Sequence, residues 1–174
     1  MEKIRYTQRI CTDQNKLEEF LLKTRTGVIA IWGEDYPYPV PVNYVWYKGA
    51  IYFHGMGTGR KNELLQKNPK VSFLVYEEYG TVKAPVPCNA DTSYLSVMIF
   101  GHAGRVEDFQ ECAEVLNKIV EKYMPGFYKN GISPTYVEKY RSSHDNRRTA
   151  VFKIVPVDMT AKENVAASDE IYGN

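Results

Sequence analysis

Hydrophobic residues recur along this chain at two spacings, and their order predicts a β-rich fold with helices at its margins. Helical spacing marks three stretches, at about residues 12–26, 109–124 and 133–140. Thr12 and Asp13 can cap the first of them, and the second is expected to be the longest helix. A further short helix is expected between the glycine-rich residues 55–59 and Pro69, with Leu64 and Leu65 facing inward.

Between these stretches, short runs of β-branched and aromatic residues predict strands. The first three are separated by the turn-forming pairs Glu34-Asp35 and Lys48-Gly49 and are expected to be successive antiparallel strands. The expected strands are 27–33, 38–47, 50–55, 71–79, 94–108 with a bend at Gly101, and 149–157. Strands and helices do not alternate regularly, so the pattern favours a six-stranded antiparallel, closed or partly closed barrel over a doubly wound sheet.

Two segments fall outside this pattern. Residues 81–93 hold two prolines and show no periodicity, which predicts an unusually long loop of the kind that covers a site. Residues 158–174 are polar and are expected to be a loosely held tail. The chain length favours one domain over residues 1–174, with a core at about residues 27–156.

The composition limits the partners and the location of the protein. With 44% hydrophobic and 25% charged residues, it is that of an ordinary globule, and no run approaches the roughly 18 apolar residues of a membrane helix. The charged N-terminus lacks the apolar segment of a secretory signal, so a cytoplasmic location is expected. Three cysteines without a C-x-x-C pair predict reduced thiols. A net charge of +1 gives no global field, so neither nucleic acid nor a membrane is an expected partner.

A glycine-rich turn, His54-Gly-Met-Gly-Thr-Gly-Arg-Lys61, is the most informative candidate site. Its glycines would let the backbone approach a ligand, and the helix that follows would direct free N–H groups outward. Arg60 and Lys61 add donors suited to a phosphate monoester, and Thr58 adds a hydroxyl. The spacing of the ATP and NAD motifs is not met. A solvated turn without a ligand is the alternative.

Polar residues on three expected strands are further candidates. His54 shares a strand face with Tyr52, away from the core, and could donate to a ligand or be a merely hydrogen-bonded histidine. Asn43 precedes Tyr44 on a strand whose prolines leave an edge unpaired, and such an edge can bind a planar heterocycle. An edge strand with a surface asparagine is the alternative. Ser96 could hydrogen-bond a ligand or lie at a barrel seam.

A metal site is not expected. His102 and His144 have no His, Cys or carboxylate partners at ligand spacing. No Ser-His-Asp or Cys-His set can be assembled from the sequence either, which disfavours a hydrolase.

Three motifs occur together: P-V-N-Y at 41–44, Y-F-H-G-x-x-x-G-R-K at 52–61 and Y-x-S-V-x-x-F-G at 94–101. In this order they resemble the FMN-binding split-barrel family related to pyridoxamine 5'-phosphate oxidase, most closely its nitroimidazole-resistance branch. The resemblance covers about Gly27 to Tyr123. It implies a homodimer with two equivalent FMN sites at the subunit interface.

The resemblance implies that the isoalloxazine ring lies along the first motif and the phosphate at the second, with contacts from the third motif supplied by one subunit or the other. With Thr58 of the turn added, the expected cofactor-binding residues are Val42, Asn43, Tyr44, His54, Thr58, Gly59, Arg60, Lys61, Ser96 and Val97.

The activity that the resemblance implies is the reduction of small planar, nitroimidazole-like compounds, with FMN as cofactor and NADH or NADPH as electron donor. His54 is the expected catalytic residue, as a proton donor to the substrate. One alternative is a non-catalytic module that binds FMN or haem, as some relatives do. Another is an oxidase related to pyridoxamine phosphate oxidase, although the C-terminal residues lack the Arg-x-His pattern with which those enzymes hold pyridoxal phosphate. The near-neutral charge disfavours a nucleic-acid-binding barrel.

Overall fold

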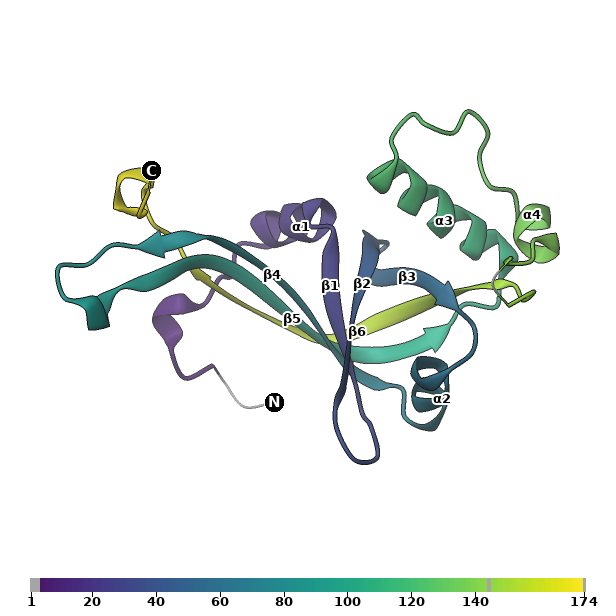
Figure 1. Ribbon diagram of the computed structural model, residues 1–174, viewed down its shortest axis with the longest axis horizontal. Coiled ribbons are helices and arrows are strands. Elements are labelled where there is room, and N and C mark those ends of the chain that lie inside the picture. Colours follow the sequence, from purple (N-terminus) through teal and green to yellow (C-terminus); the bar gives the residue numbers. More distant parts are fainter. Residues whose placement is uncertain (1–3, 144, 174) are drawn as a thin grey trace.

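The structure is a computed structural model that describes residues 4–143 and 145–173, and its strands form one closed barrel. The strands are β1 (Thr26–Ile31), β2 (Tyr38–Tyr47), β3 (Ala50–Met56), β4 (Lys70–Val82), β5 (Asp91–Arg105) and β6 (Thr149–Asn164). All neighbours are antiparallel, in the order β1-β2-β3-β6-β5-β4, and β4 closes the barrel against β1 (Figure 1). The predicted six-stranded antiparallel barrel is confirmed.

The helices lie at the margins of this barrel. They are α1 (Gln14–Lys23), α2 (Arg60–Lys67), α3 (Phe109–Tyr123) and α4 (Pro134–Lys139), with single 3-10 turns at Thr7–Arg9, Pro87–Asn89 and Ser168–Glu170. The side chains of Asp13, Asp108 and Ser133 accept hydrogen bonds from the first-turn amides of α1, α3 and α4. Helix α2 begins after Gly59 without a side-chain cap. The caps confirm where the sequence predicted three of the helices to begin.

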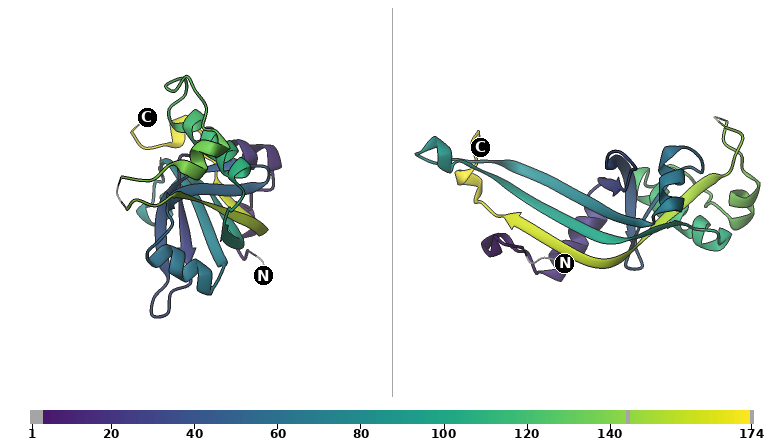
Figure 2. Two further views of the ribbon diagram at one scale, coloured as in Figure 1. Left: turned by 90° about the vertical axis from the view of Figure 1, so that its right-hand side faces the viewer. Right: turned by 90° about the horizontal axis from the view of Figure 1, so that it is seen from below.

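Strands β4, β5 and β6 extend beyond the barrel as a long ribbon (Figures 1 and 2). The pairing of β4 with β5 reaches Val82 opposite Asp91, so only residues 83–90 connect them. The prediction of a long loop over residues 81–93 is therefore wrong, and the short connection lies at the tip of the ribbon, away from the barrel. Backbone pairing holds the tip of this ribbon, where residues 78–82 of β4 are exposed or partly covered, so hydrophobic residues do not mark the end of the strand.

The C-terminal segment is also ordered by pairing. Strand β6 continues to Asn164, which lies opposite Tyr94 of β5, and Ala161 is buried. Ile171 is buried as well and forms a bridge with Val82. The expectation that residues 158–174 are loosely held is wrong for the described residues 158–173, because a polar sequence can complete a strand whose partner is already in place.

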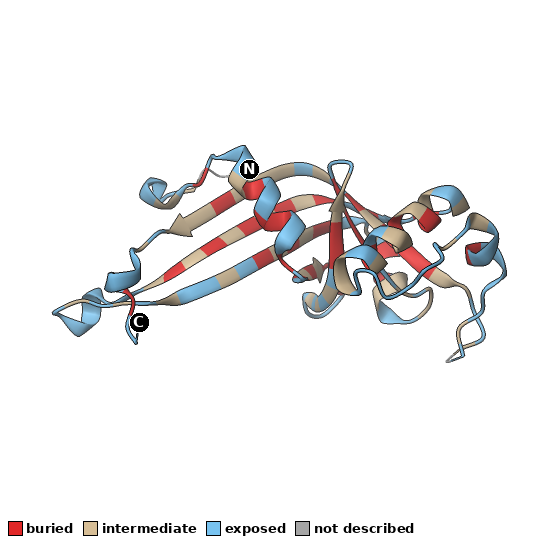
Figure 3. Cartoon of the chain, turned by 90° about the horizontal axis from the view of Figure 1, so that it is seen from above, coloured by how far each residue is buried: buried red, intermediate tan, exposed pale blue. Residues whose placement is uncertain are grey.

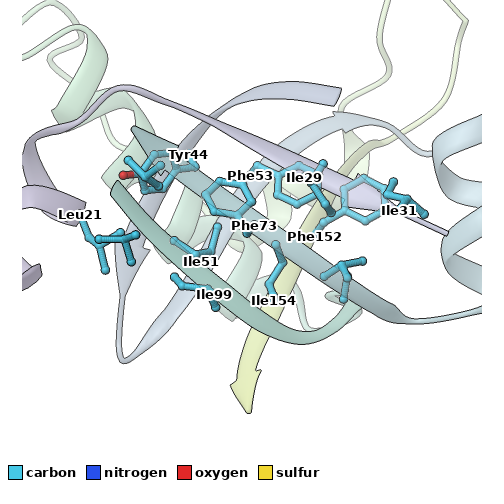
Figure 4. Packing of buried hydrophobic residues seen from close by; sticks show 14 of the residues in the cluster. Leu21, Ile29, Ile31, Tyr44, Ile51, Phe53, Phe73, Ile99, Phe152 and Ile154 are labelled. Carbon is cyan, nitrogen blue, oxygen red and sulfur yellow. The ribbon is translucent and has the colours of Figure 1, made fainter. Parts of the chain in front are cut away.

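Buried side chains form two clusters on opposite sides of the β2–β3 wall. The first fills the barrel and includes Ile29, Ile51, Phe53, Phe73, Phe152 and Ile154 (Figure 4). The second lies outside the barrel, where Val45, Tyr52 and Val151 pack against α3. The alternation of buried and exposed positions along the strands is visible in Figure 3. Helix α3 therefore covers one part of the outer face of β2 and β3 and leaves the rest open.

Gly101 lies at an irregularity in the pairing of β5 with β6, at the position where the sequence predicts a bend. A Cβ at this residue would lie 2.3 Å from the carbonyl oxygen of Val155, which is backbone and cannot move aside cheaply. We expect Gly101→Ala to lower the free energy of unfolding by about 1–3 kcal/mol, measured by urea denaturation. Gly104→Ala is the matched control in the same strand, since a Cβ there meets nothing within 4 Å. Equal losses for the two variants would contradict the steric argument.

Candidate functional site

The wall of the closed barrel has a gap in its backbone pairing, between the first half of β2 and the end of β3. Strand β3 pairs with β2 only where Ala50–Phe53 lie opposite Tyr44–Tyr47. Residues 38–43 of β2 pair with β1 alone, and residues 54–56 of β3 pair with β6 alone. We call the opening between residues 38–43 and residues 54–56 the split. It gives β2 an unpaired backbone edge, as its prolines predicted.

Alternation along β2 decides which side chains can meet a ligand at the split. Asn43 is exposed, and its Oδ1 accepts a hydrogen bond of 3.4 Å from the Thr26 hydroxyl. Val42 and Tyr44 pack into the barrel core, and Tyr44 is fully buried. Asn43 therefore faces away from Val42 and Tyr44, and those two residues could reach a surface ligand only through their backbone.

The backbone of Tyr44 is already engaged by α3. Its N–H donates to the hydroxyl of Tyr123 at 2.9 Å, and the same hydroxyl lies 2.9 Å from the Tyr44 carbonyl oxygen. The Tyr123 hydroxyl also hydrogen-bonds the carbonyl of Arg25. Tyr123 thus fixes the end of the split, a role that the sequence did not reveal because helical spacing marked this residue only as part of the apolar stripe.

His54 stands at the open end of β3 and is exposed on the outer face, as the alternation predicted. Lys61 follows His54 across the glycine turn. Its ammonium group lies 5.2 Å from the ring centre of Phe53 and 4.8 Å from the ring centre of Phe152. Burial lowers the pKa of Lys61 below its usual value. The pKa of His54 is lowered as well, first by desolvation from the surrounding chain and then by the charge of Lys61. Both causes favour the neutral form of His54.

The link between these two residues gives a testable prediction. Removing the Lys61 charge by Lys61→Met, which retains most of the side-chain volume, should raise the pKa of His54 toward its ordinary value, because the imidazolium no longer faces a like charge. An NMR titration of the histidine ring protons measures this shift. Lys67→Met, at the last turn of the same helix, should leave the His54 titration unchanged. If the pKa of His54 is the same in both variants, the charge of Lys61 is not a cause of the lowered pKa.

The start of α2 offers donors at the same place. Gly59, the N-cap residue, has φ of 88°, in the left-handed region that favours glycine. In the described structure no side chain caps the first-turn amides, so these N–H groups can receive an anion. The Arg60 guanidinium lies over the ring of Tyr38, 4.8 Å from its centre. Arg60 and Lys61 thus lie against residues of β2 and β3 that border the split.

The structure brings together the predicted residues on β2, β3 and α2, but not those on β5. Within one chain, β1 and β4 separate β5 from β2. Ser96 lines a different cavity of about 470 Å³, and its hydroxyl donates to the Lys162 carbonyl at 3.3 Å. Val97 is fully buried in the barrel core, so its side chain faces no surface ligand. Contacts from these two residues to a ligand at the split would have to come from a second subunit.

A second cavity, of about 350 Å³, adjoins the turn before α2 and was not predicted. We call it the arginine pocket; its lining residues are Gly57, Thr58, Arg105, Arg141, Asn146, Arg147 and Arg148. Thr58 therefore borders this pocket. The arginines are distant from the turn in sequence, and only the pairing of Met56 with Thr149 brings them beside it. The adjacent pair Arg147-Arg148, directly before a strand, is the sequence signal that could have revealed the pocket.

Metal ligands, cysteines and helix lengths complete the description of residues 4–143 and 145–173. They hold no group of three or more His, Cys, Asp or Glu side chains placed to bind a metal ion, and His144 lies outside them. Cys11, Cys88 and Cys112 are free thiols, as predicted. Within residues 4–143 and 145–173, no helix combines the length and the apolar character that crossing a bilayer requires.

The architecture has counterparts among solved structures. The flavocytochrome Anf3 from Azotobacter vinelandii superposes with a TM-score of 0.75 at 21% identity, over 97% of this chain and 77% of that chain. An FAD and haem binding protein from Mycobacterium smegmatis gives a TM-score of 0.72 at 15% identity, over 93% and 78% of the two chains. A proposed 5-nitroimidazole antibiotic resistance protein from Bacteroides thetaiotaomicron gives 0.67 at 25% identity, over 88% and 85%. The first two likenesses establish the fold alone.

Sequence comparison assigns the family. The search of curated proteins found no match. The family model described as pyridoxamine 5'-phosphate oxidase matches residues 13–163, which include all six strands except the last residue of β6. The chain belongs to the pyridoxamine 5'-phosphate oxidase family.

Proposed function

We propose that this chain binds FMN at the split and acts, as a homodimer, as an NADH- or NADPH-dependent reductase of small planar compounds of the nitroaromatic type. One observation carries the proposal: the unpaired edge of β2 and the uncapped start of α2, with Arg60 and Lys61, border the same opening. FMN combines a planar ring that has a polar edge with a phosphate, and these are the two groups that such an opening can bind. When bound, the flavin would supply the redox chemistry.

The residues at the split fit the two parts of this cofactor. Free backbone groups of residues 38–43 and the amide of Asn43 offer both donors and acceptors to a ring edge. The first-turn amides of α2 and the side chains of Arg60 and Lys61 offer only donors, which suits a phosphate. The family assignment supports a flavin, and so do the names of the relatives that bind FAD. The Bacteroides relative supports the nitroimidazole-resistance branch.

An apolar sheet face supports the dimer. Leu74, Met98 and Phe100 are only partly covered on the outer face of β4 and β5, where they line cavities of about 460 and 470 Å³. Trp32, beside them, is 70% exposed. A second copy of the chain would cover this face. It could also bring its own Ser96 to the split, which would explain why the predicted cofactor residues lie apart in one chain.

His54 is placed to hydrogen-bond a ligand in this proposal. His54 and Asn43 each lie one residue beyond the last β2–β3 pair, Phe53 opposite Tyr44, and both are exposed on the outer face at the two sides of the split. The lowered pKa of His54 favours the neutral ring near pH 7, which would offer an N–H hydrogen bond to the substrate; the proton-donor role expected for His54 would need the imidazolium, which is the minor form at that pH.

A non-catalytic flavin- or haem-binding module is the second candidate. The observation in its favour is that two proteins with this fold are named a flavocytochrome and an FAD and haem binding protein. Such a module would need the split and its donors but no access for a nicotinamide nucleotide.

A visible absorption titration with FMN separates these candidates, followed under anaerobic conditions by NADH and then NADPH. Flavin bands that shift on binding and then bleach with either nucleotide are the result expected for the reductase. Bands that shift and persist would favour the binding module. A spectrum of FMN that does not change on adding the protein would refute the cofactor assignment. Sedimentation velocity should show a dimer, and a monomer at micromolar concentration would refute that part of the proposal.

A further inference from the structure

The arginine pocket gathers its positive charges from separate parts of the chain. Arg105 is the last residue of β5, Arg141 follows α4, and Arg147 and Arg148 precede β6. Pairing of β5 with β6 holds Arg105 opposite Phe152. The Arg105 guanidinium also lies close to the turn, since a Cβ on Gly57 would stand 3.0 Å from its Nη1. The glycine therefore lets a guanidinium approach the backbone of the turn before α2.

Carboxylates balance only part of this charge. Glu107 lies 3.5 Å from the Nε of Arg105 and is itself well exposed. Asp145 accepts a hydrogen bond of 3.1 Å from the backbone N–H of Arg147, so it neighbours the pocket without pairing with a guanidinium. Among the described residues, no other ion pair involves the four arginines that line the pocket. Glu107 therefore pairs with one of the four guanidinium groups, and the other three have no ion pair among the described residues.

The other contacts orient the arginines without neutralising them. Nη1 of Arg141 donates to the carbonyl oxygens of Glu138 and Tyr140 at 2.7 and 2.9 Å. The Arg148 guanidinium lies over the ring of Phe109, 5.2 Å from its centre. Both contacts hold a guanidinium in place while leaving other N–H donors available, and this pre-orientation reduces the entropy lost when an anion binds.

The chemistry that matches this pocket is that of phosphate oxygens. Guanidinium groups bind them in pairs of hydrogen bonds, and the turn at Gly57 and Thr58 adds backbone amides that no described residue engages. The volume of about 350 Å³ is at the small end of ligand sites but exceeds the size of one phosphate group. We propose that the arginine pocket binds the pyrophosphate of a dinucleotide, whose two negative charges can pair with guanidinium groups that have no carboxylate partner among the described residues.

Two dinucleotides could carry this group. FAD would place its pyrophosphate beside the turn when its ring lies at the split, and NADH or NADPH would do so when its nicotinamide approaches the flavin. Gly57 and Thr58 line the arginine pocket, and the same turn leads into the start of α2, which borders the split. The choice of a dinucleotide rests on the proposed flavin site, whereas the binding of pyrophosphate by the arginines does not.

Inorganic pyrophosphate is the first probe, with binding measured by isothermal titration calorimetry on the full chain at low salt. Wild-type protein should bind it, and the double variant Arg141→Ala/Arg147→Ala should bind it about tenfold or more weakly. The double variant Arg5→Ala/Lys23→Ala removes the same charge from exposed positions elsewhere and should change the affinity less than about twofold. Arg141→Lys/Arg147→Lys keeps the charge but loses the paired hydrogen bonds, and an intermediate affinity is expected. Circular dichroism verifies that each variant is folded.

The results separate the proposal from its rivals. No binding of pyrophosphate by the wild-type chain, or equal losses in the pocket variant and the distant control, would overturn the proposal whether or not FMN binds. A loss of FAD affinity in the pocket variant with FMN affinity intact identifies FAD as the source, and a loss confined to NADH and NADPH identifies the nicotinamide nucleotides. An equal loss for FMN, which has a single phosphate, would overturn the assignment to a pyrophosphate.

Discussion

Replacing Arg60 and Lys61 together by alanine is expected to weaken FMN binding about a hundredfold or more and to leave riboflavin binding almost unchanged. The two flavins differ only in the phosphate. Both cations lie at the uncapped start of α2 beside the split, so the substitution removes charge-assisted donors that riboflavin cannot use. Flavin fluorescence titration of both ligands against the wild type and the variant measures the difference.

Because Lys61 also packs against two aromatic rings, a second variant separates charge from packing. Lys61→Met keeps apolar contact with Phe53 and Phe152 and should still weaken FMN binding selectively. Lys67→Ala is the matched control, since Lys67 lies at the other end of α2 and pairs with Glu34 at 2.5 Å. Equal losses of FMN and riboflavin affinity in the Arg60 and Lys61 variant would mean that the phosphate is bound elsewhere.

The barrel could be predicted from the sequence because its strands carry their own signals. Runs such as 27–33 and 50–55 alternate or are wholly apolar, and turn residues separate them, so their number and antiparallel order followed from local chemistry. The ribbon formed by the outer parts of β4, β5 and β6 could not be predicted in this way. Its residues are largely exposed or partly covered, and their backbone partners are strands distant in sequence.

The candidate site likewise has a part that local sequence predicts and a part that depends on tertiary packing. The turn from His54 to Lys61 is one local segment, and its glycines and cations were sufficient to predict donors at the start of a helix. Asn43 could be assigned to the same site as this turn because β2 and β3 are consecutive strands. The arginine pocket and the Tyr123 hydroxyl depend instead on which strand ends and helix ends meet, which is decided by tertiary packing. The burial of Val97 could not be predicted for a related reason, since a motif shows which residues recur and not which face they occupy; its contact with the cofactor stays a prediction.

The open part of the outer face results from where α3 lies. Val45 and Tyr52 are buried beneath this helix, whereas Asn43 and His54, one alternation further along each strand, stay exposed. The hydroxyl of Tyr52 donates to Glu111 of α3 at 2.6 Å, and Lys153 of β6 donates to the same carboxylate at 2.9 Å. These polar contacts fix the helix over one half of the wall. Helix α3 thus covers only part of the outer face of β2 and β3, and the uncovered part is where Asn43 and His54 lie.

Phe152→Ala is expected to lower the free energy of unfolding by about 3–5 kcal/mol, the largest stability effect among the substitutions considered. Phe152 is almost completely buried in the barrel and stacks on Phe53, with ring centres 5.1 Å apart and planes at 13°. Removing the ring leaves a cavity between strands that are paired on both sides and cannot collapse freely. Urea denaturation at a fixed protein concentration measures the change, because a dimer's stability depends on concentration.

Two variants test whether the loss comes from this packing. Phe152→Leu keeps most of the volume and should lose markedly less stability than the alanine variant. Val155→Ala on the same strand removes a side chain that is 51% exposed, so its effect should stay near or below about 0.5–1 kcal/mol. Since the Lys61 ammonium lies over the Phe152 ring, the alanine variant should also weaken FMN binding, whereas Val155→Ala should not. A Phe152→Ala protein that is as stable as the Val155→Ala protein would show that the barrel interior is not the main source of stability.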